Sequence, residues 1–265
     1  MAIVERFEFE GGEGLRVGRF TRRINTTCYV YRVGETLIDT GPPNQWKWIR
    51  KFIRQRRIRQ VLVTHHHEDH SGNGAPIQQE LGIPVYAPPA TMPYLINGYK
   101  VHLYRRIVWG KPGVYEALPL PPEFRASDGR IFKVIPAPGH SPDMHCILLT
   151  DKGWLFTGDL YISHKPSFSR VEEKPLIEIG SLRKVLEEDF QTVYCGHRGM
   201  VENGRAAIEA KLSYLESLKK AVEQLRRVGK SVPEIRNELL GKETFLSWVT
   251  MYHFSKKNLI ASLSG

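Results

Sequence analysis

The chain has 265 residues, a hydrophobic fraction of 41%, and 38 Lys and Arg against 28 Asp and Glu, for a formal net charge of +10 at pH 7. This length and apolar content suffice for one large or two small domains with a buried core, and they exclude a disordered chain, a collagen and a disulfide scaffold. A positive excess of this size either attracts anions or nucleic acid, or is simply solvated.

The cysteines and the hydropathy pattern bear on the compartment. Cys28, Cys146 and Cys195 are far apart and form no Cys-x-x-Cys pair. Three isolated thiols are typical of a reducing compartment and argue against a zinc site built on cysteine. No signal-peptide core is present, and no window reaches the roughly 18 uninterrupted apolar residues that span a bilayer. We therefore expect a soluble, cytoplasmic protein without a membrane partner.

The first third of the chain is predicted to form antiparallel strands over residues 4–10, 15–20, 28–33 and 35–39, because β-branched and aromatic residues alternate there with Gly and Pro turn signals. Residues 44–57 have apolar side chains three to four positions apart, which predicts a helix. Seven Lys or Arg between Lys47 and Arg59 have no acidic residue among them, so this helix is strongly basic.

A short apolar strand over 60–64 leads directly into a run of histidines, and a helix is predicted over 74–81. Residues 84–124 are rich in Pro and aromatic residues and lack a clear period, so we interpret them as an insertion or lid able to contact a substrate or a second copy in a homodimer. Strands are predicted over 131–135, 145–150, 154–157 and 191–195, with a helix over 181–189 before the last of them.

The last quarter of the chain is predicted to be helical. An apolar stripe runs from Ile208 to Leu225, and Ser231 and Glu234 form a capping box with Pro233 in the first turn. A terminal helix is expected over 244–263. We therefore divide the chain into a catalytic domain, residues 1–204, and a helical extension, residues 205–265, that packs on it.

One cluster of side chains indicates chemistry. Residues 64–70 read Thr-His-His-His-Glu-Asp-His, and three later segments each place one metal-binding side chain just after an apolar run. Imidazole and carboxylate are ligands of zinc and of neighbouring divalent metals. A histidine cluster without metal would explain the first run but not the later three residues. The seven potential ligands are His65, His67, Asp69, His70, His140, Asp159 and His197.

With these residues in this order, the sequence resembles the metallo-β-lactamase superfamily from about Thr27 to Gly199, including Leu-Ile-Asp-Thr-Gly over 37–41. The resemblance implies an α/β (α+β) fold, the four-layer αββα sandwich with its metal site at one rim, here followed by a helical C-terminal tail. It implies one metal ion held by His65, His67 and His140, and a second held by Asp69, His70 and His197. Asp159 would bridge the two ions, and Asp39 would orient a ligand.

Two divalent ions about 3.5 to 4 Å apart lower the pKa of bound water, so a bridging hydroxide could attack a carbonyl or phosphoryl centre. We expect zinc, although iron and manganese fit the same ligands. Besides Asp69 and Asp159, we consider His164 as a proton donor or substrate contact. Tyr194 and Tyr161 are considered as phenols that hydrogen-bond a developing oxyanion. His66 and Glu68 lie between ligands and are expected to point away, and Cys195 is expected to be a packed side chain.

The seven ligands resemble those of glyoxalase II-like and small endoribonuclease-like members of the superfamily more than those of true β-lactamases, whose best-known class lacks the bridging Asp and is exported. We expect a hydrolase of an ester, thioester or lactone in a small molecule. The alternative is a phosphodiesterase, phosphotriesterase or endoribonuclease that uses the basic helix together with Arg105, Arg106 and Lys111. No β-CASP insertion and no RNA-binding motif support it. A mononuclear iron persulfide dioxygenase is a third alternative, disfavoured by the intact second ligand set.

Overall fold

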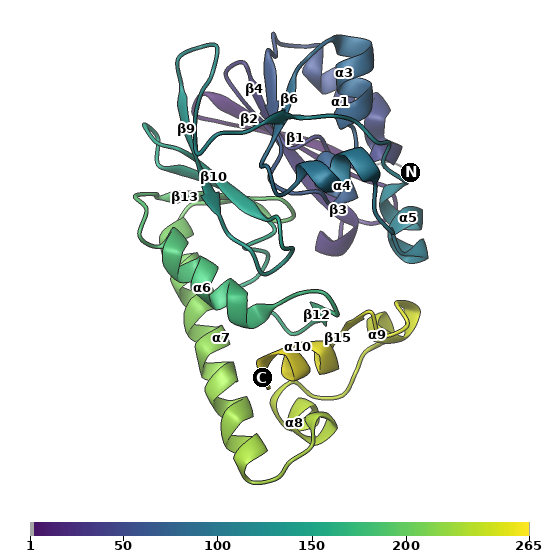
Figure 1. Ribbon diagram of the computed structural model, residues 1–265, viewed down its shortest axis with the longest axis vertical. Coiled ribbons are helices and arrows are strands. Elements are labelled where there is room, and N and C mark those ends of the chain that lie inside the picture. The colour runs from purple at the N-terminus through teal and green to yellow at the C-terminus, as the bar shows by residue number, and fades with distance from the viewer. Residues whose placement is uncertain (1–2, 265) are drawn as a thin grey trace.

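The computed structural model describes residues 3–264 and contains two β-sheets packed face to face (Figure 1). The first sheet has seven strands in chain order, of which the first four are antiparallel and the last four, from β4 on, are mutually parallel. These strands are β1 (Ile3–Phe9), β2 (Gly12–Gly18), β3 (Thr27–Val33), β4 (Thr36–Ile38), β5 (Gln60–Leu62), β6 (Val85–Ala87) and β7 (Leu118–Pro119).

The second sheet has six strands in the order β14-β13-β11-β10-β9-β8. Only the β11–β13 pair is parallel, and the other neighbours are antiparallel. Its strands are β8 (Glu123–Arg125), β9 (Ile131–Pro136), β10 (His145–Leu149), β11 (Trp154–Gly158), β13 (Thr192–Cys195) and β14 (Gly199–Val201).

Helices cover the outer face of each sheet. The first sheet is flanked by α1 (Trp46–Ile53), α3 (Gly74–Leu81), α4 (Met92–Asn97) and α5 (Leu103–Trp109), and the second by α6 (Pro175–Val185) and α7 (Gly204–Arg227). Short turns of helix are η1 (Ile24–Thr26), η2 (Pro43–Gln45) and α2 (Glu68–Ser71). None of the helices within residues 3–264 has the length and apolar character needed to cross a membrane.

Three separate apolar layers hold this arrangement together. The central layer lies between the sheets and includes Tyr31, Phe132 and Phe156. The two outer layers join each sheet to its helices, for example through Phe52 of α1 and Leu182 of α6. Because each sheet is buried on both faces, the fold is the predicted four-layer αββα sandwich.

The strand directions bring the functional loops to one rim. β4 and β5 are parallel, so their carboxyl ends share an edge of the first sheet. β9, β11 and β13 run in one direction, because β10 is antiparallel to β9 and β11, and β11 is parallel to β13. Two backbone hydrogen bonds join the sheets at this rim, from the Tyr29 amide to the Gly196 carbonyl and from the His145 amide to the Thr64 carbonyl. Loops that leave these five strand ends therefore converge.

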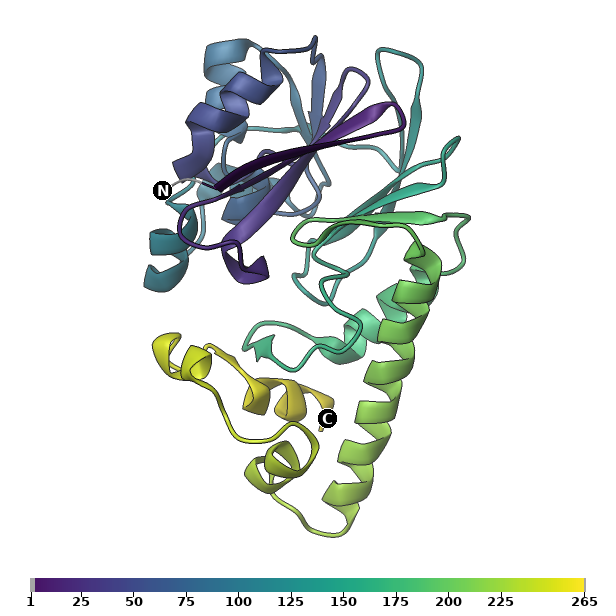
Figure 2. The same cartoon turned by 180° about the vertical axis from the view of Figure 1, so that it is seen from behind.

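The C-terminal extension begins with the long helix α7 and lies below the sandwich in these views (Figures 1 and 2). It continues through α8 (Val232–Leu239), α9 (Phe245–Val249), β15 (Phe254–Ser255) and α10 (Lys256–Leu263). The extension has a small apolar core of its own, which includes Val222, Ile235 and Ile260. β15 pairs with β12 (Ser169–Arg170), which connects the extension to a loop of the sandwich.

Several predicted elements differ from the structure. The expected helix over 244–263 is two helices and a strand, because Met251 and Tyr252 have φ angles of 51° and 58° and interrupt the right-handed helix. The second strand covers 12–18 and not 15–20, since a tight turn at Glu10 and Gly11 follows β1 directly. The helix expected over 181–189 is α6, which begins with Pro175 at its first position.

Two further expectations need correction. The ends of the 84–124 region form β6, β7 and β8, so only about residues 88–117 lie outside the sheets. The basic helix is shorter than expected, and four cations of its segment pair with acids from elsewhere: Arg50 with Glu80, Arg56 with Glu13, and both Arg57 and Arg59 with Glu35. The capping box of Ser231 and Glu234 is present as predicted.

Candidate metal centre

The first predicted ligand set gathers three imidazoles from the loops after β5 and β9. Nδ1 of His67 lies 3.0 Å from Nε2 of His65 and 3.0 Å from Nε2 of His140. All three side chains are buried, and their nitrogens lie with a carboxylate oxygen of Asp159 within 4.8 Å of one another. This spacing suits a single divalent ion.

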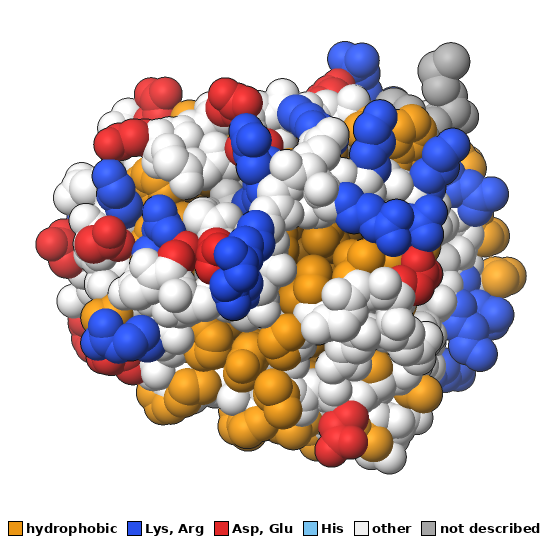
Figure 3. Space-filling view, turned by 90° about the horizontal axis from the view of Figure 1, so that it is seen from above, with side chains coloured by type: hydrophobic (Ala, Val, Ile, Leu, Met, Phe, Trp, Pro, Cys, Tyr) orange, Lys and Arg blue, Asp and Glu red, His pale blue; other side chains and the backbone are white. Residues whose placement is uncertain are grey.

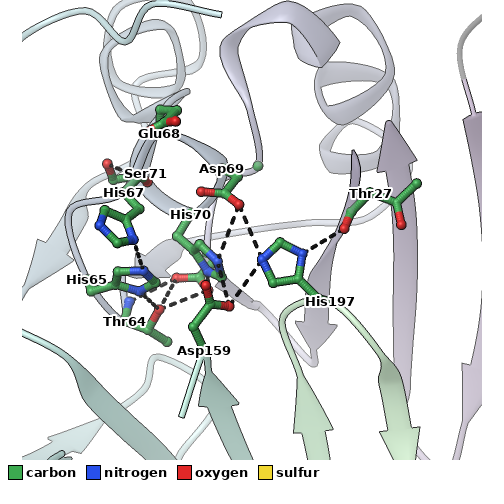
Figure 4. Close-up of polar contacts among 12 residues, drawn as sticks. Thr27, Thr64, His65, His67, Glu68, Asp69, His70, Ser71, Asp159 and His197 are labelled. Atoms are coloured by element: carbon green, nitrogen blue, oxygen red, sulfur yellow. Dashed lines mark hydrogen bonds and ion pairs between the residues drawn. The ribbon is translucent and has the colours of Figure 1, made fainter. Parts of the chain in front are cut away.

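The second predicted set gathers Asp69, His70 and His197, whose ligand atoms also lie within 4.8 Å of one another. Nε2 of His197 lies 3.3 Å from Oδ2 of Asp69, and Nε2 of His70 lies 4.0 Å from the same oxygen. Figure 4 shows these side chains converging from the α2 region and from the loop after β13.

Asp159 stands between the two sets at the end of β11. Its Oδ2 lies 3.1 Å from His140 Nε2, whereas its Oδ1 lies 3.2 Å from His70 Nε2 and 3.3 Å from His197 Nε2. Each carboxylate oxygen therefore faces a different ligand set, as a bridging ligand requires.

The donor set fits divalent cations. Within residues 3–264, both carboxylate oxygens of Asp69 and of Asp159, and Nε2 of His70, are buried and accept or donate no well-aligned hydrogen bond. Buried polar atoms in this number are otherwise rare in folded proteins. Oxygen and imidazole nitrogen are atoms that zinc, iron and manganese all bind.

The pKa shifts of the clustered side chains are consistent with metal binding. Burial lowers the pKa of His65 and of His67, so both imidazoles stay neutral and keep a lone pair for a metal. Burial alone would raise the pKa of Asp159, but the facing imidazoles of His197, His70 and His140 hold it well below its usual range. The carboxylate is therefore ionised. Burial opposes the charged form of these three imidazoles, but Asp159 raises the pKa of all three, and a bound cation would take the place of their protons.

Groups behind the second ligand set fix the tautomers of its two imidazoles. His70 Nδ1 lies 2.7 Å from Asp39 Oδ2, and His197 Nδ1 donates over 2.7 Å to the carbonyl of Thr27. Because the Nδ1 of each ring is engaged on the side away from the cluster, its Nε2 is free for a metal.

Two imidazoles of the first set are held in the same way. His140 Nδ1 lies 3.1 Å from Glu173 Oε1. Behind His65, Nδ1 lies 3.1 Å from the Thr64 hydroxyl, which in turn donates to the Asp39 carboxylate. Both rings therefore present Nε2 to the cluster.

Asp39 occupies the position expected of a residue that orients a ligand. It follows β4 with a φ angle of 61°, a conformation that non-glycine residues adopt rarely. Its Oδ1 accepts a 2.8 Å hydrogen bond from the Thr64 amide while its Oδ2 meets His70. Asp39 thus connects the loop after β4 to the loop that carries the histidines.

His66 and Glu68 point away from the cluster, as expected, and each has a partner of its own. His66 Nδ1 lies 2.7 Å from Asp143 Oδ1. The fully buried Glu68 carboxylate accepts from Arg105 Nε at 2.7 Å and from Arg105 Nη2 at 2.8 Å. These pairs fix the ligand-bearing loop from behind.

Three residues considered for catalysis make no direct contact with the ligands among the interactions found within residues 3–264. Tyr194 is packed between the sheets, its ring centroid 4.5 Å from that of Phe9 and 4.9 Å from that of Phe156. Strand β13 alternates, so Tyr194 faces the central layer while its neighbours Val193 and Cys195 face the outer one. Tyr161 is likewise buried in the outer apolar layer, and His164 is exposed to solvent on its loop. The packing of Tyr194 and Tyr161 in apolar layers does not support the oxyanion roles considered for them. The role considered for His164 stays a prediction, since its neighbours Ser163 and Lys165 line a cavity beside His140.

A cavity of about 180 Å³ opens beside the cluster and is lined by Asp69, His140 and His197. Its apolar walls come from α5, from the loop after β11 and from the C-terminal extension, and include Val108, Trp109, Ile162, Leu246 and Phe254. A neighbouring cavity of about 340 Å³ touches His140 and Asp159 and extends towards α7. Both the 84–124 region and the extension thus contribute to the space in front of the ligands.

Sequence reasoning missed Glu173 and Arg170, and it considered Arg105 only as a phosphate contact. Glu173 meets His140, Arg105 meets Glu68, and Arg170 Nη1 lies 3.3 Å from His67 Nδ1 and 3.4 Å from His140 Nε2. All three lie far along the chain from their partners, in segments without a repeating pattern. No local signal marks them, because only the packing of α5 and of the β12 loop brings them to the centre.

Comparison with known proteins agrees with the fold described above. The family model described as Metallo-beta-lactamase superfamily matches residues 21–231. An atrochrysone carboxyl ACP thioesterase of Pseudocercospora fijiensis is 28% identical over 240 residues, which cover 84% of this chain and 63% of that protein. A protein of the same name from Aspergillus fumigatus is 27% identical over 202 residues, covering 71% of this chain and 55% of that protein. The chain thus spans little more than half the length of these relatives.

A solved structure shares the fold over nearly the whole chain. A metallo-beta-lactamase family protein from Thermus thermophilus superposes with a TM-score of 0.68 at 16% identity, covering 96% of this chain and 91% of that one. The likeness includes the region of the helical extension, since so little of this chain is left uncovered.

Proposed function

The chain belongs to the metallo-β-lactamase superfamily, and from this membership we propose that it is a dinuclear metal-dependent hydrolase of a thioester or related carboxylic ester in a small molecule. The observation that carries the proposal is the position of Asp159, whose two oxygens face the two ligand sets at 3.1–3.3 Å. His65, His67 and His140 would hold one ion, and Asp69, His70 and His197 the other. Two such ions supply a hydroxide nucleophile at neutral pH.

The protein's own residues would then bind and orient the substrate. The cavity walls formed by Trp109, Leu246 and Phe254 favour an apolar acyl group and exclude water from the reacting carbonyl. Asp39 and Glu173 keep the imidazoles of His70 and His140 in the tautomer that presents Nε2. A thioester is favoured over a lactone or a simple ester by the names of the two fungal relatives.

Metal analysis combined with a substrate panel tests this proposal. The purified protein should contain two divalent ions per chain and should hydrolyse acyl thioesters without consuming oxygen, and both properties should disappear in His67→Ala. Zinc is the expected metal, with iron or manganese as alternatives. A single iron ion per chain together with oxygen consumption would instead identify an oxygenase and refute hydrolysis.

A phosphodiester substrate could be attacked at the same centre, so hydrolysis of phosphodiesters and of RNA belongs in the panel. The structure gives this alternative little support. The basic segment of α1 packs outside the first sheet and is partly neutralised by Glu13, Glu35 and Glu80. Arg105 is engaged with the buried Glu68 carboxylate.

A further inference from the structure

Arg170 lies beside the predicted ligands, and its ion pair with an acid is weak. Its side chain is only 15% exposed and lines the cavity beside the metal centre. Nη1 lies 3.3 Å from His67 Nδ1 and 3.4 Å from His140 Nε2. Since a guanidinium only donates hydrogen bonds, it cannot serve as a metal ligand itself.

A comparison with Arg105, which lines the same cavity, shows what distinguishes Arg170. Arg105 makes two short hydrogen bonds to the Glu68 carboxylate, at 2.7 and 2.8 Å, so its charge is balanced. The ion pair of Arg170 within residues 3–264 is a single long contact, 3.9 Å from its Nε to Glu173 Oε1. Glu173 is moreover shared with His140. Nε contacts Glu173 and Nη1 contacts the two imidazoles, whereas Nη2 has no contact of this kind within residues 3–264 and keeps its donors available for a ligand.

The C-terminal extension positions this guanidinium. Arg170 belongs to β12 and pairs with Phe254 of β15, and the next amide, of Val171, donates to the His253 carbonyl over 3.1 Å. On the same side, Tyr104 of α5 contacts His253 through its hydroxyl. Because the backbone on both sides of Arg170 is held by the extension, the cation has a defined place over the cavity.

Resting on the proposed function, we propose that Arg170 is the residue with which the site recognises a carboxylate carried by the acyl group of its substrate. A guanidinium binds a carboxylate through two parallel hydrogen bonds, which are strong in an apolar cavity. The carboxylates of Asp69 and Glu173 line the same cavity and repel a dianionic phosphate more strongly than a carboxylate with a single charge. The substrate is thus an acyl thioester with an apolar body and one carboxylate.

A binding measurement tests this assignment independently of turnover. Benzoate and its neutral counterpart benzamide are titrated by calorimetry into the metal-free and the zinc-loaded protein. We expect Arg170→Gln to weaken benzoate binding at least about tenfold in both forms and to leave benzamide binding unchanged. Arg170→Lys should retain part of the affinity. The control is Arg183→Gln, since Arg183 is exposed, pairs with Glu216 of α7 and does not line the cavity.

A second measurement compares two substrates that differ only at one group, the succinyl and butyryl thioesters of N-acetylcysteamine. The wild type should prefer the succinyl thioester, and Arg170→Gln should lower this preference in kcat/KM at least about tenfold with an unchanged zinc content. Equal loss on both thioesters, or loss of zinc, would show that Arg170 only supports the ligands. If the wild type hydrolyses neither thioester, the proposed function fails, while the benzoate titration still decides whether Arg170 binds carboxylates.

Discussion

Asp159 is the residue on which both ligand sets depend, because its Oδ1 faces His70 and His197 and its Oδ2 faces His140. Asp159→Asn keeps the shape of the side chain but removes the negative charge that would balance the two proposed cations. We expect metal affinity to fall by more than the 10–100-fold typical of losing a residue behind a ligand, with turnover falling in parallel. Elemental analysis after dialysis measures this. Asp189→Asn, an exposed position, is the control; full metal content and turnover in Asp159→Asn would refute the two-ion arrangement.

Glu173 offers a finer test, because it acts on a ligand and not on the ion. Its Oε1 lies 3.1 Å from His140 Nδ1. Glu173→Gln should weaken metal binding about 10- to 100-fold while the protein stays folded, measured by competition with a chromophoric chelator. The adjacent Glu172 contacts His253 and none of the ligands, so Glu172→Gln should bind metal as the wild type does. Equal affinities for the two variants would remove Glu173 from the metal centre.

The three thiols give a prediction about chemical reactivity. Cys28, Cys146 and Cys195 are fully buried, and burial raises the pKa of each thiol. Because a raised pKa leaves less thiolate at any given pH, native protein at pH 8 should react with a disulfide reagent far more slowly than free cysteine does. All three thiols should react after denaturation. One thiol that reacts rapidly in the native protein would contradict this, and if that thiol were Cys195 it would contradict the expectation of a packed side chain.

At the scale of elements, α5 is joined to the metal-binding loop by one buried ion pair. Arg105→Met should destabilise the protein by about 3–5 kcal/mol, because it leaves the Glu68 carboxylate buried without a cation, with only the 3.3 Å hydrogen bond from the Tyr99 hydroxyl remaining. Denaturant unfolding measures the change. Arg106→Met, at the exposed neighbouring position, should change stability little. The double variant Glu68→Gln, Arg105→Met should recover a large part of the loss, and a double variant as unstable as Arg105→Met would exclude the unpaired charge as the cause.

At the same scale, the positions of some functional side chains could be predicted from the sequence and those of others could not. The ligands in residues 65–70 are close in the chain, and His140, Asp159 and His197 each follow a short apolar strand, so their convergence could be predicted from local patterns. The position of Tyr194 could not. In a sheet buried on both faces, Val193, Tyr194 and Cys195 show no alternation of polar and apolar side chains from which to tell the two faces apart.

At the scale of the whole molecule, the contact between the C-terminal extension and the candidate metal centre could not be predicted from the sequence pattern. The stripe of α7 predicted packing, but the return of the chain through Met251 and Tyr252 to pair β15 with β12 depends on two residues with positive φ. Neither residue type signals such a turn. As a result, a segment expected only to pack on the catalytic domain also contributes Leu246 and Phe254 to the cavity.

The net charge of +10 is a second property of the whole molecule. It leads to different salt dependences for a nucleic-acid substrate and for a small thioester. Figure 3, which views the end of the molecule away from the extension, shows basic side chains along one side of that face and acidic ones interleaved with them on the other. A surface that bound a nucleic acid through 6–10 phosphates would lose roughly 10³–10⁵ in affinity between 50 and 200 mM salt.

A thioester with a single carboxylate held inside a cavity is screened far less by salt. We therefore expect kcat/KM for a succinyl thioester to change less than about threefold over the same salt range, while a neutral thioester changes even less. Initial rates at constant pH and metal concentration measure this. A steep decline for the thioester would mean that the exposed charges, and not the buried guanidinium of Arg170, attract the substrate. Steep salt dependence accompanied by cleavage of RNA would instead favour the nuclease, because only a polyanion engages many of the surface cations at once.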